Sequence, residues 1–139
     1  MRHADVVEVS REVGATRSRT AKTAALAAVV RRAPVAEVGV VVAHLSGVLP
    51  QRRLGVGFRS LGTLPAPATA PSLTVADVDS AFGSLATASG SGSATVRREV
   101  LAGLLARATA DEQQFITGLI TGNLRQGALD GVVLAATAA

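Results

Sequence analysis

The sequence predicts an all-α fold in which two related helical lobes pack as one multi-helix domain. Apolar residues recur at helical spacing along most of the chain, and the chain resembles itself after a shift of about 75 positions. A proline-rich segment, "GTLPAPATAPS", separates the two halves. We therefore expect a first lobe at 1–61, a linker at 62–72 and a second lobe at 73–139.

The first lobe should contain a helix after Pro34, because proline suits the first turn of a helix. The apolar positions that predict this helix are Val38, Val41, Val42, Leu45 and Leu49. The valine run at 40–42 would also suit a strand, but the spacing around it favours a helix.

The second lobe shows three further helical patterns. Their apolar positions are Val78, Phe82 and Leu85, then Leu101, Leu104, Leu105 and Ala108, and then Phe115, Ile116, Leu119, Ile120 and Leu124. Thr74 with Asp77, and Thr109 with Glu112, have the spacing of a capping box, which marks the start of a helix. The segment "ASGSGS" at 88–93 predicts a loop ahead of a helix.

The internal similarity aligns charged, hydroxyl and glycine positions in one order, which chance matches in an alanine-rich chain do not explain well. The aligned pairs include Ser18 with Ser93, Thr20 with Thr95, Lys22 with Arg97, Glu37 with Glu112, Gly47 with Gly122 and Gln51 with Gln126. After a short slip, Arg53 and Gly55 align with Arg125 and Gly127. We expect the two lobes to be structurally related.

The composition narrows the kinds of site that the chain can hold. The net charge of +4 comes almost entirely from arginine, because Lys22 is the only lysine. Guanidinium groups match phosphate oxygens well, which favours a nucleic-acid partner, although the codon usage of a GC-rich genome would also enrich arginine. The absence of cysteine excludes disulfides and cysteine zinc sites. His3 and His44 lie far apart and lack the spacing of metal ligands, so we expect structural roles for them and no metal.

The sequence favours a soluble, cytoplasmic protein. The most apolar run, 38–49, is too short to span a bilayer and contains His44 and Ser46. Asp5, Glu8 and Glu12 stand where a signal peptide would need an apolar core. Because the repeat already supplies two related lobes within one chain, dimerisation is not needed to pair them, and we expect a monomer. The short apolar run leads us to expect no membrane partner.

The stretch "GNLRQGALDG" at 122–131 reads as the middle of a helix, where a glycine costs roughly 0.5–1 kcal/mol relative to alanine. Gly118, Gly122, Gly127 and Gly131 would fall roughly along one face of that helix. A face without side chains admits either a packed helix or a sugar-phosphate strand. Arg125 suits the second reading, and both stay open.

Two predicted helix starts, at matching positions of the repeat, combine basic and hydroxyl side chains. Free backbone amides at a helix start favour an anion, and cations there are unfavourable for the helix unless an anion lies nearby. The candidate phosphate contacts are Ser18, Arg19 and Lys22 in the first lobe and Gly90, Ser91, Gly92, Ser93, Arg97 and Arg98 in the second. The scarcity of aromatic residues disfavours stacking on single strands, which leaves backbone contact with duplex DNA.

Four short segments point to a known family. They are "SRTAK" at 18–22, "LGVG" at 54–57, "SGSGS" at 89–93 and the G-x-L-R-x-G motif within "FITGLITGNLRQGALDGVVLAATA" at 115–138. In this order they resemble the N-terminal DNA-binding domain of ATP-dependent DNA ligases, and the resemblance covers essentially the whole chain.

The resemblance implies an all-helical domain whose two pseudo-symmetric halves grip the minor groove on both sides of a nick. By position it implies backbone contacts at Ser18, Arg19, Lys22, Gly122, Arg125 and Gly127, with the loop at 90–93, Arg97 and Arg98 in a similar role. Asn123 stands where the family often has a basic residue. The implied partners are nicked or duplex DNA and the adenylation and OB-fold domains of the same ligase chain. The resemblance also implies roles in DNA replication, repair and recombination, and ATP and Mg²⁺ as cofactors of the full-length enzyme.

The chain departs from a complete ligase in one respect. Ligase chemistry needs a lysine in a K-x-D-G motif to carry AMP, but Lys22 is followed by "TAAL", and "LDGV" at 129–132 lacks the lysine. We therefore expect a segment that is non-catalytic by itself and binds no cofactor. The alternative is a helical protein–protein interaction module without DNA binding. An independent enzyme fits least, because no nucleophile–base pair or cofactor loop is recognisable.

Overall fold

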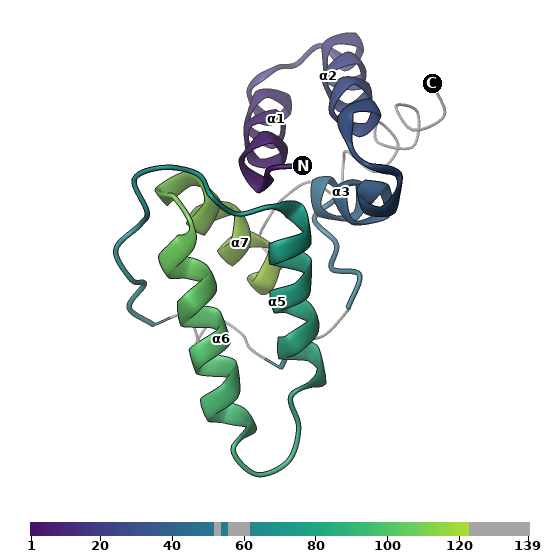
Figure 1. Ribbon diagram of the computed structural model, residues 1–139. Coiled ribbons are helices and arrows are strands. Elements are labelled where there is room, and N and C mark those ends of the chain that lie inside the picture. Colours follow the sequence, from purple (N-terminus) through teal and green to yellow (C-terminus); the bar gives the residue numbers. More distant parts are fainter. Residues whose placement is uncertain (52–53, 56–61, 123–139) are drawn as a thin grey trace.

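The computed structural model describes residues 1–51, 54–55 and 62–122, and within these ranges it is built from helices without a β-sheet (Figure 1). The helices are α1 (His3–Ala15), α2 (Arg19–Arg32), α3 (Val38–Leu45), α5 (Val75–Thr87), α6 (Ser93–Arg107) and α7 (Ala110–Thr121), with a 3₁₀ turn, η1 (Val35–Glu37), before α3. The predicted all-α class is confirmed.

Helices α1 and α2 pack side by side, and α3 lies beneath them (Figure 1). The helix predicted from the valine spacing is α3, so the strand alternative for 40–42 is wrong. Pro34 immediately precedes η1 and not a full α-helical turn. Helix α3 ends at Leu45 because Gly47 adopts a positive φ of 74° and its amide donates to the carbonyl of His44.

Helices α5 and α7 begin where their capping boxes predict. The Thr74 hydroxyl accepts from the Asp77 amide and the Asp77 carboxylate accepts from the Thr74 amide, both at 3.0 Å. Thr109 and Glu112 form the same reciprocal pair at 3.3 and 3.0 Å. The glycine–serine segment forms the predicted loop between α5 and α6. Residues 62–72 contain no helix, although the boundaries of the lobes and the pseudo-repeat stay predictions.

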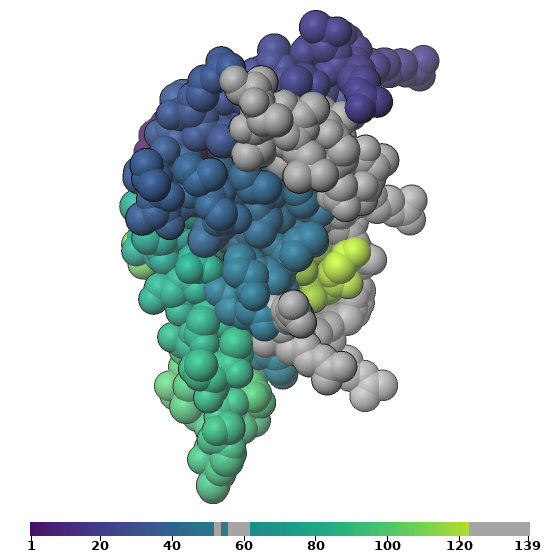
Figure 2. All heavy atoms as spheres, turned by 90° about the vertical axis from the view of Figure 1, so that its right-hand side faces the viewer, coloured from purple at the N-terminus to yellow at the C-terminus, as the bar shows by residue number. Residues whose placement is uncertain are grey.

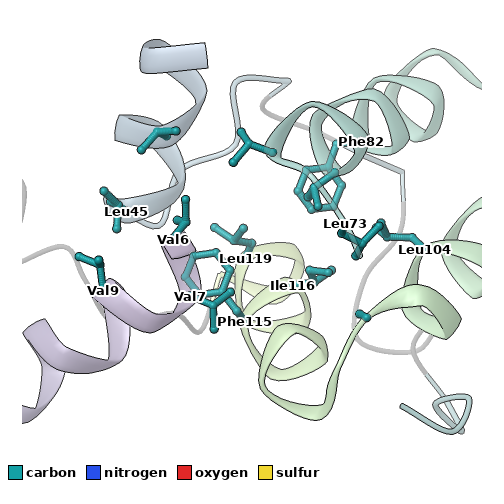
Figure 3. Packing of buried hydrophobic residues seen from close by; sticks show 14 of the residues in the cluster. Val6, Val7, Val9, Leu45, Leu73, Phe82, Leu104, Phe115, Ile116 and Leu119 are labelled. Carbon is teal, nitrogen blue, oxygen red and sulfur yellow. The ribbon is translucent and has the colours of Figure 1, made fainter. Parts of the chain in front are cut away.

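The start of α1 is joined to the start of α5. The His3 amide donates to the Leu73 carbonyl and the Val75 amide donates to the Met1 carbonyl, each at 2.9 Å. A single apolar cluster then runs through all the α-helices. Figure 3 shows its central part, with labelled side chains from α1, α3, α5, α6 and α7. Val6 of α1, Leu45 of α3, Phe82 of α5 and Ile116 of α7 are each fully buried in it. Burial of one such side chain contributes roughly 1.5–3 kcal/mol to the stability of the fold. Because these residues come from helices before and after the segment 62–72, both halves of the chain share one core.

Two buried histidines lie between the halves. The ring of His3 meets Phe115 of α7 edge-on at 5.5 Å, and the ring of His44 meets Phe82 of α5 edge-on at 5.8 Å. Neither ring has a hydrogen-bond partner among the described residues. Burial, and then the proximity of His44, lower the pKa of His3 to about 3. Burial also lowers the pKa of His44 to about 4, against the opposing effect of Asp79. The fold thus brings together two residues that are distant in sequence, and both rings pack within the core.

Candidate nucleic-acid interface

The start of α2 carries the first group of predicted contact residues. The Ser18 hydroxyl caps the helix by accepting from the Ala21 amide at 3.2 Å. Arg19 is exposed as the first residue of the helix, and Lys22 lies one turn later, partly exposed. A helix start of this kind leaves amide donors and the positive end of the helix dipole facing solvent, which suits an anion.

The same face of α2 continues as a shallow groove of about 580 Å³. The residues that line it are Arg19, Thr20, Thr23, Ala24, Ala27 and Arg31. Arg19 and Arg31 stand at its two ends, with hydroxyl and small side chains between them. Sequence reasoning missed Arg31, although the spacing of 19, 23, 27 and 31 places these positions on one helical face.

The loop before α6 carries the second group. Gly90 and Gly92 adopt positive φ values of 80° and 83°, and a Cβ atom at either position would meet nothing within 4 Å. The loop therefore offers open, side-chain-free backbone beside the start of α6. Arg98 is exposed on the first turns of that helix, whereas Ser91 is exposed and Ser93 is half-buried.

Arg97 is held within the protein. Its Nη2 donates to the Ala88 carbonyl at 2.5 Å and its Nε donates to the Leu85 carbonyl at 3.4 Å. Both carbonyls lie at the C-terminal end of α5, where a cation is favourable. A cation near the start of α6 therefore has a partner inside the protein, and a phosphate is not needed to explain it.

Gly122 ends a helix and does not lie in the middle of one, so the reading of 122–131 as a helix interior is wrong at its first residue. Helix α7 ends at Thr121, and Gly122 adopts a φ of 72°, with its amide bonded to the carbonyls of Gly118 and Leu119. Glycine is favoured there because a side chain would strain this left-handed conformation. The proposed glycine face at Gly127 and Gly131, together with Asn123 and Arg125, lies outside the described residues.

Some of the described cations form salt bridges with carboxylates and others do not. Four arginines are paired with carboxylates: Arg2 and Arg32 with Asp5, Arg11 with Asp111, and Arg107 with Asp77. The cations that form no ion pair within the described ranges, apart from Arg97, are Arg17, Arg19, Lys22, Arg31 and Arg98. Apart from Arg98, the latter set lies on α2 or directly before it. The cations without an ion pair are therefore concentrated along α2 and at the start of α6, and they include Arg17 and Arg31, which are not among the predicted contacts.

The two helix starts lie at opposite ends of the molecule (Figure 1). Seen from the side, the C-terminal end of α7 reaches the surface between them (Figure 2). The fold does not join the two groups into one pocket. The two groups lie apart on the surface, and the C-terminal end of α7, at Gly122, lies between them.

A groove of about 830 Å³ between α1 and the start of α7 has the opposite character. Glu8, Glu12 and Asp111 line it together with Arg11, which pairs with Asp111 at 2.7 Å. This surface would repel a polyanion. Neither here nor in any other described part of the chain do three histidine or acidic side chains gather as a metal site would require. No helix among the described residues is long and apolar enough to cross a membrane.

Comparison with known proteins agrees with the sequence resemblance. A family model described as "DNA ligase N terminus" matches residues 56–138. The chain is 54% identical over 135 residues to a probable DNA ligase of Beutenbergia cavernae, covering 97% of this chain and 26% of the relative. It is 53% identical over 140 residues to a probable DNA ligase of Rhodococcus jostii, covering 100% of this chain and 28% of the relative. It thus spans about a quarter of the length of these relatives.

Proposed function

Because this chain belongs to the family of DNA ligase N-terminal domains, we propose that it holds duplex DNA, nicked or intact, by contacts with the sugar-phosphate backbone. The observation that carries the proposal is the separation of the cations. Those not paired with carboxylates lie on or just before α2 and at the start of α6. The paired ones are Arg2 and Arg11 at α1, Arg32 at the last position of α2 and Arg107 at the last position of α6. Unpaired, exposed arginines are available to replace the counterions of a phosphate chain.

The proposed contacts come from both ends of the molecule. At one end they are Ser18, Arg19 and Lys22, joined by Arg31 along the α2 groove. At the other they are Arg98 and the backbone of the loop at 90–93. Gly122 supplies a side-chain-free surface between them, and Arg125 and Gly127 extend the set by family resemblance. Contacts of this kind position a duplex without reading its sequence.

This domain would serve as the DNA-holding part of an ATP-dependent ligase in replication, repair and recombination, acting in the cytoplasm. Its partners would be the adenylation and OB-fold domains of the same chain. ATP and Mg²⁺ would supply the adenylation chemistry there. The described residues hold and orient the duplex, and no chemical step is assigned to them.

A salt titration of binding tests the proposal. The chain is titrated onto a short nicked duplex, the intact duplex and one of its single strands, from low to physiological salt. We expect duplex binding whose log–log slope steepens by about 0.9 for each neutralised phosphate, and weaker binding to the single strand. A complete lack of duplex binding at low salt would contradict the proposal and favour a protein-interaction module.

A further inference from the structure

We propose that Arg97 is a positioning residue, which fastens the end of α5 to the backbone at Gly55 and thereby fixes the loop that presents Arg98 to DNA. The DNA part of this inference rests on the proposed function. The fastening itself does not, because it is defined by contacts within the protein.

The first contact is with α5. The last carbonyls of a helix lack donors within the helix and carry partial negative charge. The Arg97 guanidinium donates to two of them, the carbonyls of Leu85 and Ala88, from one turn inside α6. This joins the end of α5 to the start of α6 across the loop at 88–92. The position of that loop is therefore fixed from inside the protein.

The second contact is with Gly55. A Cβ atom at this position would lie 2.6 Å from both Cζ and Nε of Arg97. Unbonded carbon atoms prefer about 3.5–4.0 Å, so any side chain here would displace the guanidinium. Gly55 also has a φ of +71°. The backbone conformation thus favours glycine at this position, and any side chain would in addition have to move the guanidinium aside.

A neighbouring contact supports the same arrangement. The Gln51 amide nitrogen donates to Asp79 of α5, to its carboxylate at 2.6 Å and to its carbonyl at 3.3 Å. Leu54 is buried in the core. The chain near Gly55 is therefore attached to the middle of α5 through Gln51 and approaches the end of α5 through Arg97.

The adjacent residues Arg97 and Arg98 of α6 point in different directions and so have different roles. Successive residues of an α-helix point about 100° apart, because one turn takes about 3.6 residues. Arg97 faces α5 and Gly55, whereas Arg98 is exposed. One cation holds the loop and the other is free to meet a phosphate.

A stability cycle tests the fastening without DNA. The variants are Gly55→Ala, Arg97→Gln and the double variant, with Gly90→Ala as the control, because Gly90 has a similar φ of +80° but open space at its Cβ position. We expect Gly55→Ala to lower the denaturant midpoint further than Gly90→Ala, and the double variant to fall little below Gly55→Ala. Equal losses for both glycine variants, or strictly additive losses for the pair, would overturn the inference.

DNA binding then separates positioning from contact. In conditions where all variants are folded, we expect Arg97→Gln and Gly55→Ala to weaken duplex binding roughly threefold or more with no change in salt slope. Arg98→Ala should flatten the slope by about 0.9. A slope that falls by the same amount in Arg97→Gln would make Arg97 a direct phosphate contact and overturn the inference. If the unaltered chain binds no duplex, the proposed function fails, while the stability cycle still decides the fastening.

Discussion

The starts of α2 and α6 carry similar residues but use them differently. At α2, a serine hydroxyl caps the helix and the nearby cations Arg19 and Lys22 form no ion pair in the described part. At α6, a glycine in the left-handed conformation stands before the helix and one of two adjacent arginines points inward to α5. Two helix starts with similar sequences thus leave different numbers of cations without a partner within the protein, and only such cations are candidates for phosphate contact.

Both helix starts are attached to the same apolar core, and acid should destabilise that core. The pKa values of His3 and His44 are lowered to about 3 and about 4, from an ordinary value of 6.5. Stability is then complete above pH 6.5 and is lost as the pH falls towards the folded-state values. At pH 5 each histidine should cost roughly 2 kcal/mol of the free energy of unfolding.

Denaturant unfolding at pH 7.5 and pH 5 measures this loss, in a range where ordinary carboxylates stay ionised. A variant with His3→Leu and His44→Leu serves as the matched control, since leucine cannot take up a proton. Its stability should change much less between the two pH values. Equal pH dependence in both proteins would show that the buried rings do not limit acid stability.

Replacement of Arg19 and Arg31, which both line the α2 groove, tests the role of this helix in DNA binding. Arg19→Ala combined with Arg31→Ala should flatten the salt slope of duplex binding by about 1.8, twice the value for one phosphate. The control is Arg2→Ala with Arg32→Ala, which removes two exposed arginines that pair with Asp5. A similar loss of slope in the control would mean that the unpaired arginines of α2 contribute no more to DNA binding than the paired ones.

At the start of α6, we expect a single residue, Arg98, to affect the salt dependence of DNA binding. Arg98→Ala should flatten the slope by about 0.9, while Arg107→Ala on the same helix should leave it unchanged, because Arg107 pairs with Asp77 at 3.3 Å. Both slopes come from fluorescence anisotropy across a range of salt concentrations. An unchanged slope in Arg98→Ala would remove α6 from the interface.

The smallest expected effect concerns the serine cap. Ser18→Ala removes the acceptor for the Ala21 amide and should lower the free energy of unfolding by about 1 kcal/mol. Ser18→Asp keeps an acceptor and should restore stability, but its negative charge should weaken DNA binding. Thermal unfolding and binding are measured together, and a stable Ser18→Asp variant with undiminished affinity would place DNA away from this helix start.

Local sequence signals predicted the helix boundaries well. The capping boxes at Thr74 and Thr109 depend on contacts within four residues, so their hydrogen bonds could be predicted from spacing alone. Gly122 was misjudged because the apolar pattern of α7 continues to Leu124 in the sequence. A glycine shortly after a helical pattern is also a signal for the end of a helix, and this signal is the one that holds here.

Contacts between side chains that are distant in sequence could not be predicted in the same way. Arg97 and Arg98 are adjacent, and what separates them is the position of α5 and Gly55 in three dimensions. The approach of His3 to His44 depends likewise on how the two halves share a core. The position of Arg31 on the same face of α2 as Arg19 could have been predicted from the sequence, since the two residues are three steps of four residues apart.

Arginine modification with and without DNA tests whether the arginines that form no ion pair are the ones that contact the duplex. The chain is treated with phenylglyoxal in the presence and absence of a nicked duplex, and the modified residues are identified by mass spectrometry. We expect DNA to protect Arg17, Arg19, Arg31 and Arg98, while Arg2, Arg11, Arg32 and Arg107 react equally in both conditions. Equal protection of both sets, or protection confined to the arginines that pair with carboxylates, would show that the unpaired arginines do not form the DNA-binding surface.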